Sequence, residues 1–180
     1  MVINYVSYSV IILVATFVLI EQTNLSAEDQ IKRDATFYGI NEDPFWNYKA
    51  DDIPQFVEML KQTHCGSIRI PIRWRVVEHT KGNWDFSAID RVVQMIPDDI
   101  QILGTLMSIP EWANGIDPKK AEGWFDVYPP KDISDWESYV SKTVQKYKHR
   151  IKHWEIWNEE NGIDFYRPLP DAKAYTELLK

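Results

Sequence analysis

Short apolar runs alternate with amphipathic stretches through most of this chain. Four runs, at 36–41, 67–71, 101–107 and 153–157, are too short for helices and are typical of buried strands. Each run is followed by a stretch with apolar residues at helical spacing. The alternation predicts four βα units, in which parallel strands form a sheet and helices cover it.

The helical stretches carry start signals. The first two are expected to begin at Asp52, with Pro54 in the first turn, and at Ser87, a serine cap followed by an acid at the third position. The third shows the same capping pattern from Ser134, and the fourth begins at Asp171. The apolar faces are expected to bury the following residues: Phe56, Val57, Leu60, His64, Ile89, Val92, Val93, Ile96, Trp136, Tyr139, Val140, Val144, Tyr147, Tyr175, Leu178 and Leu179.

Four βα units predict an α/β fold of the (β/α)8 TIM-barrel type, of which only the first four units are present. A closed barrel needs roughly 250 residues, so residues 28–180 are expected to form a half barrel that stops inside the fourth helix. The alternative is a complete doubly wound α/β domain. That fold usually has a glycine-rich phosphate-binding turn after its first strand, where this chain has Asn-Glu-Asp-Pro at 41–44.

The N-terminus resembles a secretory leader. Residues 1–20 carry no charged side chain, and Ala27 offers a small residue at a cleavage point, so 1–27 is interpreted as a signal peptide. The alternative is an uncleaved anchor, and contact with a membrane is expected only if residues 1–20 are kept. The expected location is secreted or extracellular, or periplasmic in a Gram-negative cell. The lone Cys65 excludes an internal disulfide and is interpreted as a packing residue.

The composition excludes some classes of partner and of bound group. The chain is 44% apolar and 26% charged, which is typical of a globular protein, and its net charge of −7 argues against a nucleic-acid partner. The four histidines, His64, His79, His149 and His153, match no metal-binding spacing. No metal and no cofactor are therefore expected.

Tryptophan is concentrated where a barrel would bind its ligand, in loops at the carboxyl ends of the strands. Six of the eight tryptophans fall in or next to these loops. Together they predict an aromatic rim that stacks against flat sugar faces. They are Trp46, Trp74, Trp84, Trp112, Trp124 and Trp157.

The sharpest candidate for chemistry is Asn158-Glu159, at the mouth of the fourth strand. Burial among aromatic rings disfavours an ionised carboxyl group, and a general acid needs this property to protonate a leaving glycosidic oxygen. Asn158 is placed to bind a sugar hydroxyl. An isolated Asn-Glu pair would more often be a surface feature, and the surrounding sequence favours the chemical role.

The segment 154–161 (Trp-Glu-Ile-Trp-Asn-Glu-Glu-Asn), followed by Gly162, Phe165 and Pro168, resembles the acid/base motif of the clan A glycoside hydrolases. Family 39 is nearest and family 5 less close. Two further blocks are similar in the same order: Ile68-Arg69-Ile70 with Trp74, Glu78, Gly82, Asp85, Phe86, Ser87, Ile89 and Asp90, and then Leu103, Leu106, Pro110, Trp112 and Ala113. The resemblance implies a retaining glycosidase barrel, with Glu159 as acid/base, Asn158 beside it and Arg69 in support. Substrate contacts are expected from Asn158, Arg69, Trp74, Trp112, Trp157 and Trp46.

The chain departs from the family pattern at two points. Glu160 stands where these families usually have proline. The resemblance also places the nucleophile on a seventh strand, which this chain lacks. Glu155 is expected to pair with Arg69 rather than act as nucleophile, and Glu78 or Glu111 would suit only the wider spacing of an inverting enzyme.

The predicted function is hydrolysis of O-glycosidic bonds in an oligosaccharide or glycoside, by a chain that lacks its own nucleophile. Two alternatives stay open: a noncatalytic carbohydrate-binding protein derived from a glycosidase, and a short hydrolase that uses Glu78 or Glu111. A half barrel also leaves two sheet edges exposed, which predicts self-association. Xyloside, glucoside, galactoside and uronide all remain candidate substrates.

Overall fold

The computed structural model describes residues 38–117 and 119–180. The predicted leader at 1–27 lies outside these residues, as does the beginning of the first predicted strand. Within the described ranges, no helix has both the length and the apolar character needed to cross a membrane.

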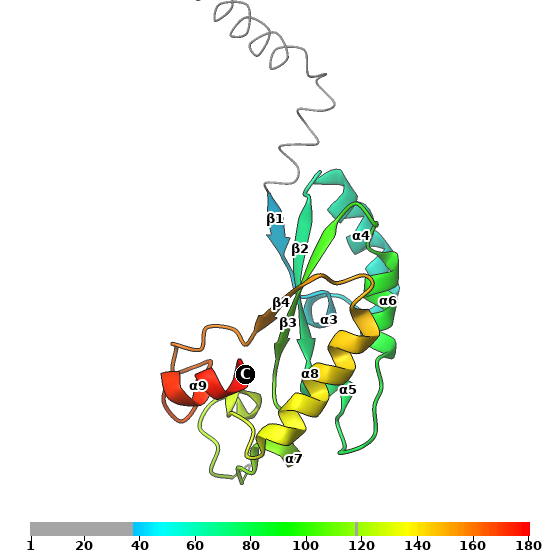
Figure 1. The fold of residues 1–180 in the computed structure, drawn as a ribbon. Coiled ribbons are helices and arrows are strands. Elements are labelled where there is room, and N and C mark those ends of the chain that lie inside the picture. The colour runs from blue at the N-terminus through cyan, green and yellow to red at the C-terminus, as the bar shows by residue number, and fades with distance from the viewer. Residues whose placement is uncertain (1–37, 118) are drawn as a thin grey trace, which may run out of the picture.

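The described residues form one parallel four-stranded sheet (Figure 1). Its strands lie side by side in sequence order: β1 (Gly39–Asn41), β2 (Ser67–Arg73), β3 (Gln101–Met107) and β4 (His153–Ile156). Each neighbouring pair is parallel. The barrel is not closed, and β1 and β4 are the edges of the sheet. The prediction of a partial (β/α) barrel is confirmed.

Three crossover helices lie on one face of the sheet (Figure 1). They are α4 (Ile53–Gln62), α6 (Ser87–Met95) and α8 (Ile133–Tyr147), and α9 (Ala172–Leu178) follows β4. A crossover helix returns on the same face each time because the connection between parallel strands is right-handed. Alternate residues of β2, namely Ile68, Ile70 and Ile72, are fully buried in the core that this face shares with the helices.

Five short helices interrupt the loops and were not predicted, because three or four residues are too few to show a helical period. All five lie in the loops that connect a strand to the next crossover helix. They are α3 (Pro44–Asn47), η1 (Ala50–Asp52), α5 (Trp74–Val77), α7 (Glu111–Asn114) and η2 (Phe125–Val127).

The predicted serine caps are wrong, because each serine already lies inside its helix and its backbone N–H donates to an aspartate two residues earlier. The Asp85 carboxylate accepts from the Ser87 backbone N–H at 2.8 Å, and Ser87 is already helical. Asp132 is the N-cap of α8 and accepts from both the backbone N–H and the hydroxyl of Ser134. Asp171 caps α9 as predicted.

The predicted buried faces are confirmed for most residues, while Val140, Val144 and Tyr175 are only partly buried and two predicted residues are exposed. His64 lies beyond the end of α4, has a φ of 54° and is exposed. Leu179 follows the last residue of α9 and is 53% exposed. Cys65 is buried, as expected for a packing residue.

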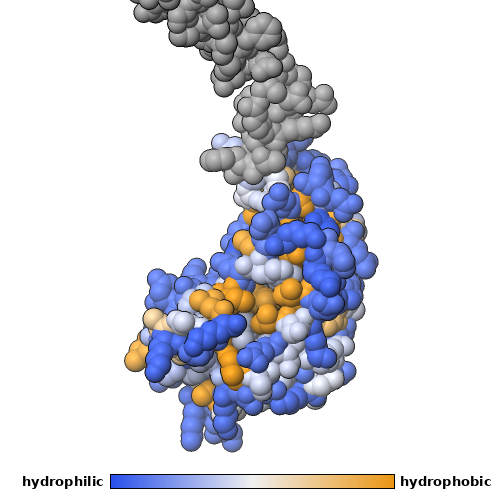
Figure 2. Space-filling view, in the orientation of Figure 1, coloured by the Kyte–Doolittle hydropathy of each residue, from blue (hydrophilic) through white to orange (hydrophobic). Residues whose placement is uncertain are grey.

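One side of the molecule carries uncovered apolar surface. Figure 2 shows it across the centre of the view, where Figure 1 draws β4 beside α8. Trp154 and Ile156 of β4 are only partly buried, as are Val140 and Val144 of α8. Because β4 is an edge strand with apolar neighbours, this side is suited to contact with further polypeptide.

Candidate active site

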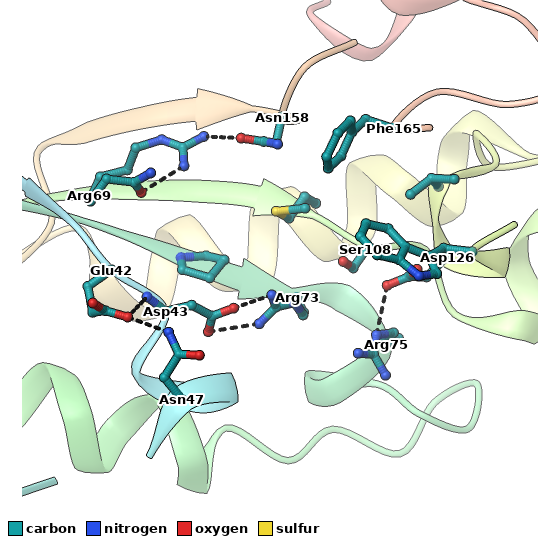
Figure 3. Close-up of a pocket in the computed structure, with 15 residues that line it drawn as sticks. Glu42, Asp43, Asn47, Arg69, Arg73, Arg75, Ser108, Asp126, Asn158 and Phe165 are labelled. Atoms are coloured by element: carbon teal, nitrogen blue, oxygen red, sulfur yellow. Dashed lines mark hydrogen bonds and ion pairs between the residues drawn. The ribbon is translucent and has the colours of Figure 1, made fainter. Parts of the chain in front are cut away.

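A cleft of about 670 Å³ opens at the carboxyl ends of the strands. Its lining comes from β1, β2 and β3 and from the loops after all four strands (Figure 3). Parallel βα folds bind their ligands at this end of the sheet, because the connecting loops there can vary without disturbing the core.

Arg69 joins three strands at the floor of the cleft. Its Nε donates to Glu155 Oε2 at 2.6 Å, one Nη donates to Asn41 Oδ1 at 3.1 Å, and the other donates to Asn158 Oδ1 at 2.9 Å (Figure 3). Thr105 Oγ1 also donates to Glu155 Oε2, at 2.9 Å. The expected pairing of Glu155 with Arg69 is confirmed. Because its carbonyl oxygen accepts from Arg69, the Asn158 amide is held at the mouth of β4.

Two further ion pairs brace the other walls of the cleft. The guanidinium of Arg73 makes a two-pronged contact with the carboxylate of Asp43, which follows β1. Arg75 Nε lies 2.8 Å from Asp126 Oδ2, which belongs to the loop after β3. Figure 3 shows these pairs on separate sides of the cleft. Both fix loops from different strands relative to one another.

The backbone is strained where β3 and β4 end. Ser108 has a φ of 62°, Trp157 of 71° and Glu159 of 51°, all in the left-handed region that favours glycine. The strained residues are held by neighbours: the Ser108 carbonyl accepts from the Arg75 N–H at 2.9 Å, and the Trp157 N–H donates to the Leu106 carbonyl at 2.8 Å. Such conformations persist where the surroundings determine them, and they cluster at functional sites.

Glu159 itself is exposed. The predicted enclosure of its carboxyl group by aromatic rings is not found among the described residues. Asn158 lines the cleft, whereas Glu159 lies just beyond the lining. The structure therefore brings together Arg69, Asn158 and Glu155, and leaves the Glu159 side chain exposed and outside the cleft lining.

The fold is similar to solved structures of glycoside hydrolases. A family 39 glycoside hydrolase from the gut symbiont Bacteroides cellulosilyticus WH2 matches 78% of this chain at 18% identity, with a TM-score of 0.54. A β-galactosidase from the haloarchaeon Halorubrum lacusprofundi matches 71% at 18% identity, with a TM-score of 0.56. A β-glucosidase from Micrococcus antarcticus matches 72% at 17% identity, with a TM-score of 0.50.

This chain has the fold of a partial glycoside hydrolase barrel. It spans 28%, 22% and 29% of the lengths of those three structures, respectively. No protein-family model and no curated protein matches the sequence. The resemblance to clan A and family 39 glycoside hydrolases is thus confirmed at the level of the fold.

Two predicted sugar-binding rings of the partial barrel belong to its core instead. Trp74 is fully buried, stacked on Tyr139 with ring centroids 5.2 Å apart. Trp157 is 2% exposed and donates from Nε1 to the Phe165 carbonyl at 2.7 Å. Neither ring has a free face for a sugar. The prediction failed because α5 turns Trp74 inward immediately after β2, and the left-handed backbone at Trp157 turns that ring into the protein.

The other predicted rings differ from one another. Trp112 packs edge to face on Trp74, donates from Nε1 to the Glu78 carbonyl and does not line the cleft. Trp46 lies in α3, and its side chain is outside the described part. Trp124 does line the cleft, is 63% exposed and meets Phe165 edge to face at 5.7 Å between centroids. Among the described side chains of the predicted tryptophan rim, only Trp124 lines the cleft, where its neighbour Phe165 adds a second ring.

The carboxylates considered for an inverting enzyme do not face the cleft. Glu78 is buried, and its carboxylate accepts from Trp74 Nε1 at 2.8 Å and from the Gly82 N–H at 2.7 Å. It holds the turn after α5 in place. Glu111 is the first residue of α7 and is absent from the cleft lining. The short-hydrolase alternative loses both of its carboxylates.

Several cleft residues were not predicted. Asp43, Arg73, Arg75 and Asp126 carry no motif, and their only signal in the sequence is their position at or after a strand end. The described residues contain no group of three or more histidine, cysteine, aspartate or glutamate side chains arranged to hold a metal ion.

Proposed function

We propose that this chain is part of a retaining glycoside hydrolase in which Glu159 is the general acid/base. The observation that carries the proposal is the Arg69 network, which fixes Asn158 at the mouth of β4 and so fixes the backbone that presents Glu159. The cleft beside it offers amide, carboxylate and hydroxyl groups together with the exposed ring of Trp124. Polar groups for hydroxyls and a flat apolar face for ring C–H groups are what a sugar requires.

The chemistry assigns one step to Glu159. As the glycosidic C–O bond breaks, its carboxyl proton moves to the leaving oxygen, and a second carboxylate attacks the anomeric carbon from the opposite face. The Glu159 carboxylate then takes a proton from the water that releases the sugar. Asn158 accepts from Arg69 through its carbonyl oxygen, so its amide N–H groups are directed elsewhere and can donate to a sugar hydroxyl.

We infer that the nucleophile is supplied from outside the described residues. A retaining pair lies about 5 to 5.5 Å apart. Glu42 lines the cleft after β1, and its carboxylate accepts hydrogen bonds from Asn47 Nδ2 and the Asp43 N–H. Asp43 and Asp126 are paired with Arg73 and Arg75. The polypeptide that supplies the nucleophile would also cover the exposed carboxyl group of Glu159 and raise its pKa by burial.

The proposal can be tested with azide as a substitute nucleophile. Azide attacks the anomeric carbon, the glycosidic bond breaks, and a glycosyl azide of inverted configuration forms. A phenyl glycoside needs a proton on its leaving oxygen, whereas a 2,4-dinitrophenyl glycoside leaves without one. We expect the full chain to use both substrates only when azide is present, and Glu159→Gln to retain the dinitrophenyl substrate alone.

Glu160→Gln is the matched control, because it removes one carboxyl group at the next position and should retain both reactions. Equal loss of both substrates in Glu159→Gln would show that Glu159 does not act as an acid. Turnover of the phenyl glycoside without azide would show that this chain supplies its own nucleophile.

A second candidate function is carbohydrate binding without catalysis. The exposure of Glu159 favours it, because a binding protein has no need to bury this carboxyl group. Glycoside binding that is weakened by Trp124→Ala, with no azide-dependent cleavage of either substrate, would support this alternative.

A further inference from the structure

Every guanidinium group that lines the cleft is paired with a carboxylate. Three guanidinium groups and three carboxylates contribute to the lining: Arg69, Arg73, Arg75, Glu42, Asp43 and Asp126. Each guanidinium lies against a carboxylate, with Arg69 on Glu155, Arg73 on Asp43 and Arg75 on Asp126. The cleft therefore holds no net positive charge that would attract an anionic ligand.

The three guanidinium groups differ in how many of their nitrogen donors lack a partner. Arg69 donates hydrogen bonds from Nε and from both Nη groups to Glu155, Asn41 and Asn158, respectively. Arg73 spends both Nη groups on Asp43. Arg75 Nε lies 2.8 Å from Asp126 Oδ2 as an ion pair without a hydrogen bond, and its Nη groups make no hydrogen bond to another described residue. Only Arg75 could receive a ligand carboxylate without losing a partner.

Glu42 is the uncompensated charge of the cleft. Its Oε1 accepts from Asn47 Nδ2 and from the Asp43 N–H, and among the described residues it makes no ion pair (Figure 3). Both donors are neutral, so neither of them brings a positive charge to this carboxylate. A sugar hydroxyl can donate to Glu42, whereas a sugar carboxylate would meet it as a like charge.

We infer that the cleft selects an uncharged sugar ring and rejects a uronide, and that Glu42 is the specificity-determining residue. This inference rests on the proposed function and narrows the four candidate substrates to the three neutral ones. A uronate would have to displace Asp43 or Asp126 from an existing ion pair, or bind the one incompletely used guanidinium while Glu42 repels it. A neutral glycoside incurs neither cost.

The test is calorimetric titration of the full chain at pH 7 and low salt with two matched pairs of phenyl thioglycosides. The pairs are glucoside with glucuronide and galactoside with galacturonide. The members of a pair differ in the carboxylate at C6, so the ratio of their dissociation constants isolates the effect of charge. We expect the uronide of the better-bound pair to bind roughly tenfold more weakly. Raising the salt concentration should shrink the ratio.

Two variants separate Glu42 from the overall acidity of the chain. Glu42→Gln keeps the hydrogen-bonding shape, and we expect it to bring the ratio close to one. Glu137→Gln removes the same charge from an exposed position on α8, outside the cleft lining, and should leave the ratio unchanged. An equal change of the ratio in both variants would overturn the role of Glu42.

The remaining outcomes distinguish the inference from the proposed function. Uronide binding as tight as that of the neutral partner, with loss of that binding in Arg75→Gln, would overturn the inference and leave the proposed sugar site standing. Binding of neither member of either pair would overturn both.

Discussion

Arg69 is the residue whose replacement should disturb the site most. Arg69→Met keeps an apolar stem of similar length and removes the guanidinium group that joins Asn41, Glu155 and Asn158. The side chains of Arg69 and Glu155 are 22% and 40% exposed, so solvent screens their ion pair. We assign that pair about 1 kcal/mol and each amide hydrogen bond about 0.5 to 1 kcal/mol.

The free energy of unfolding should fall by about 2 to 3 kcal/mol in Arg69→Met. For a chain of this size each kcal/mol lowers the melting temperature by about 2 to 4 °C, so a drop of roughly 4 to 12 °C is expected. Thr105 continues to hydrogen-bond Glu155, which limits the loss. Urea unfolding followed by tryptophan fluorescence measures the change.

A double-mutant cycle with Glu155→Gln isolates the ion pair. The variant Arg69→Met/Glu155→Gln should be less destabilised than the sum of the two single variants, because the second substitution removes a carboxylate that has already lost its partner. Wild-type stability in Arg69→Met, or strictly additive effects in the cycle, would refute the view that this network holds the mouth of β4.

The remaining predictions concern the core, the cleft wall, a helix cap and the sheet edge. Trp74→Phe loses the hydrogen bond to buried Glu78 and part of the ring volume, so its free energy of unfolding in urea should fall by about 2 to 3 kcal/mol while glycoside binding is retained. Weakened binding at normal stability would show that Trp74 contacts the sugar. Trp124→Ala should affect binding rather than stability: the free energy of unfolding should change by less than about 0.5 kcal/mol, and glycoside binding measured by calorimetry should weaken roughly three- to tenfold. At the N-cap of α8, hydrogen bonds from Ser134 lower the pKa of the Asp132 carboxyl group below the usual 3.8, so the ionised carboxylate stabilises the fold and this stabilisation is lost as pH falls through the lowered pKa. In acid titrations, the difference in stability between wild type and Asp132→Ala should therefore shrink below about pH 3.8. A difference that stays constant with pH would contradict the assignment. The open edge of β4 and its apolar surroundings predict self-association, so light scattering should show a mass that rises with concentration, whereas a monomer at every concentration would mean that this side is covered.

The sheet could be predicted because its strands are periodic and apolar. β3 begins and ends at the predicted residues, 101 and 107, and the prediction for β2 stopped two residues before its end. The missing residues, Ile72 and Arg73, continue the strand past Pro71, where the sequence suggested a stop. Helix caps were harder to predict, because aspartate and serine near a helix start both fit a capping pattern and only the observed hydrogen bonds distinguish them.

The candidate site was predicted in part. The family resemblance and strand parity predicted that Arg69 lies near Glu155 and Asn158, and the Arg69 side chain on β2 reaches past β3 to contact both. Ring orientation could not be predicted, because Trp74 and Trp124 both occupy loops after strands and differ only in local backbone geometry. Ion pairs such as Arg75 with Asp126 join residues far apart in the sequence, and no local pattern announces them.

The central claim is that Glu159 delivers a proton to the leaving oxygen of a glycoside bound in this cleft. The most direct measurement is the yield of glycosyl azide from a phenyl glycoside and from its 2,4-dinitrophenyl counterpart, with wild type and Glu159→Gln compared at equal azide concentration. The account predicts both products from wild type and only the dinitrophenyl-derived product from the variant. Equal yields from the two proteins with the phenyl substrate would contradict it.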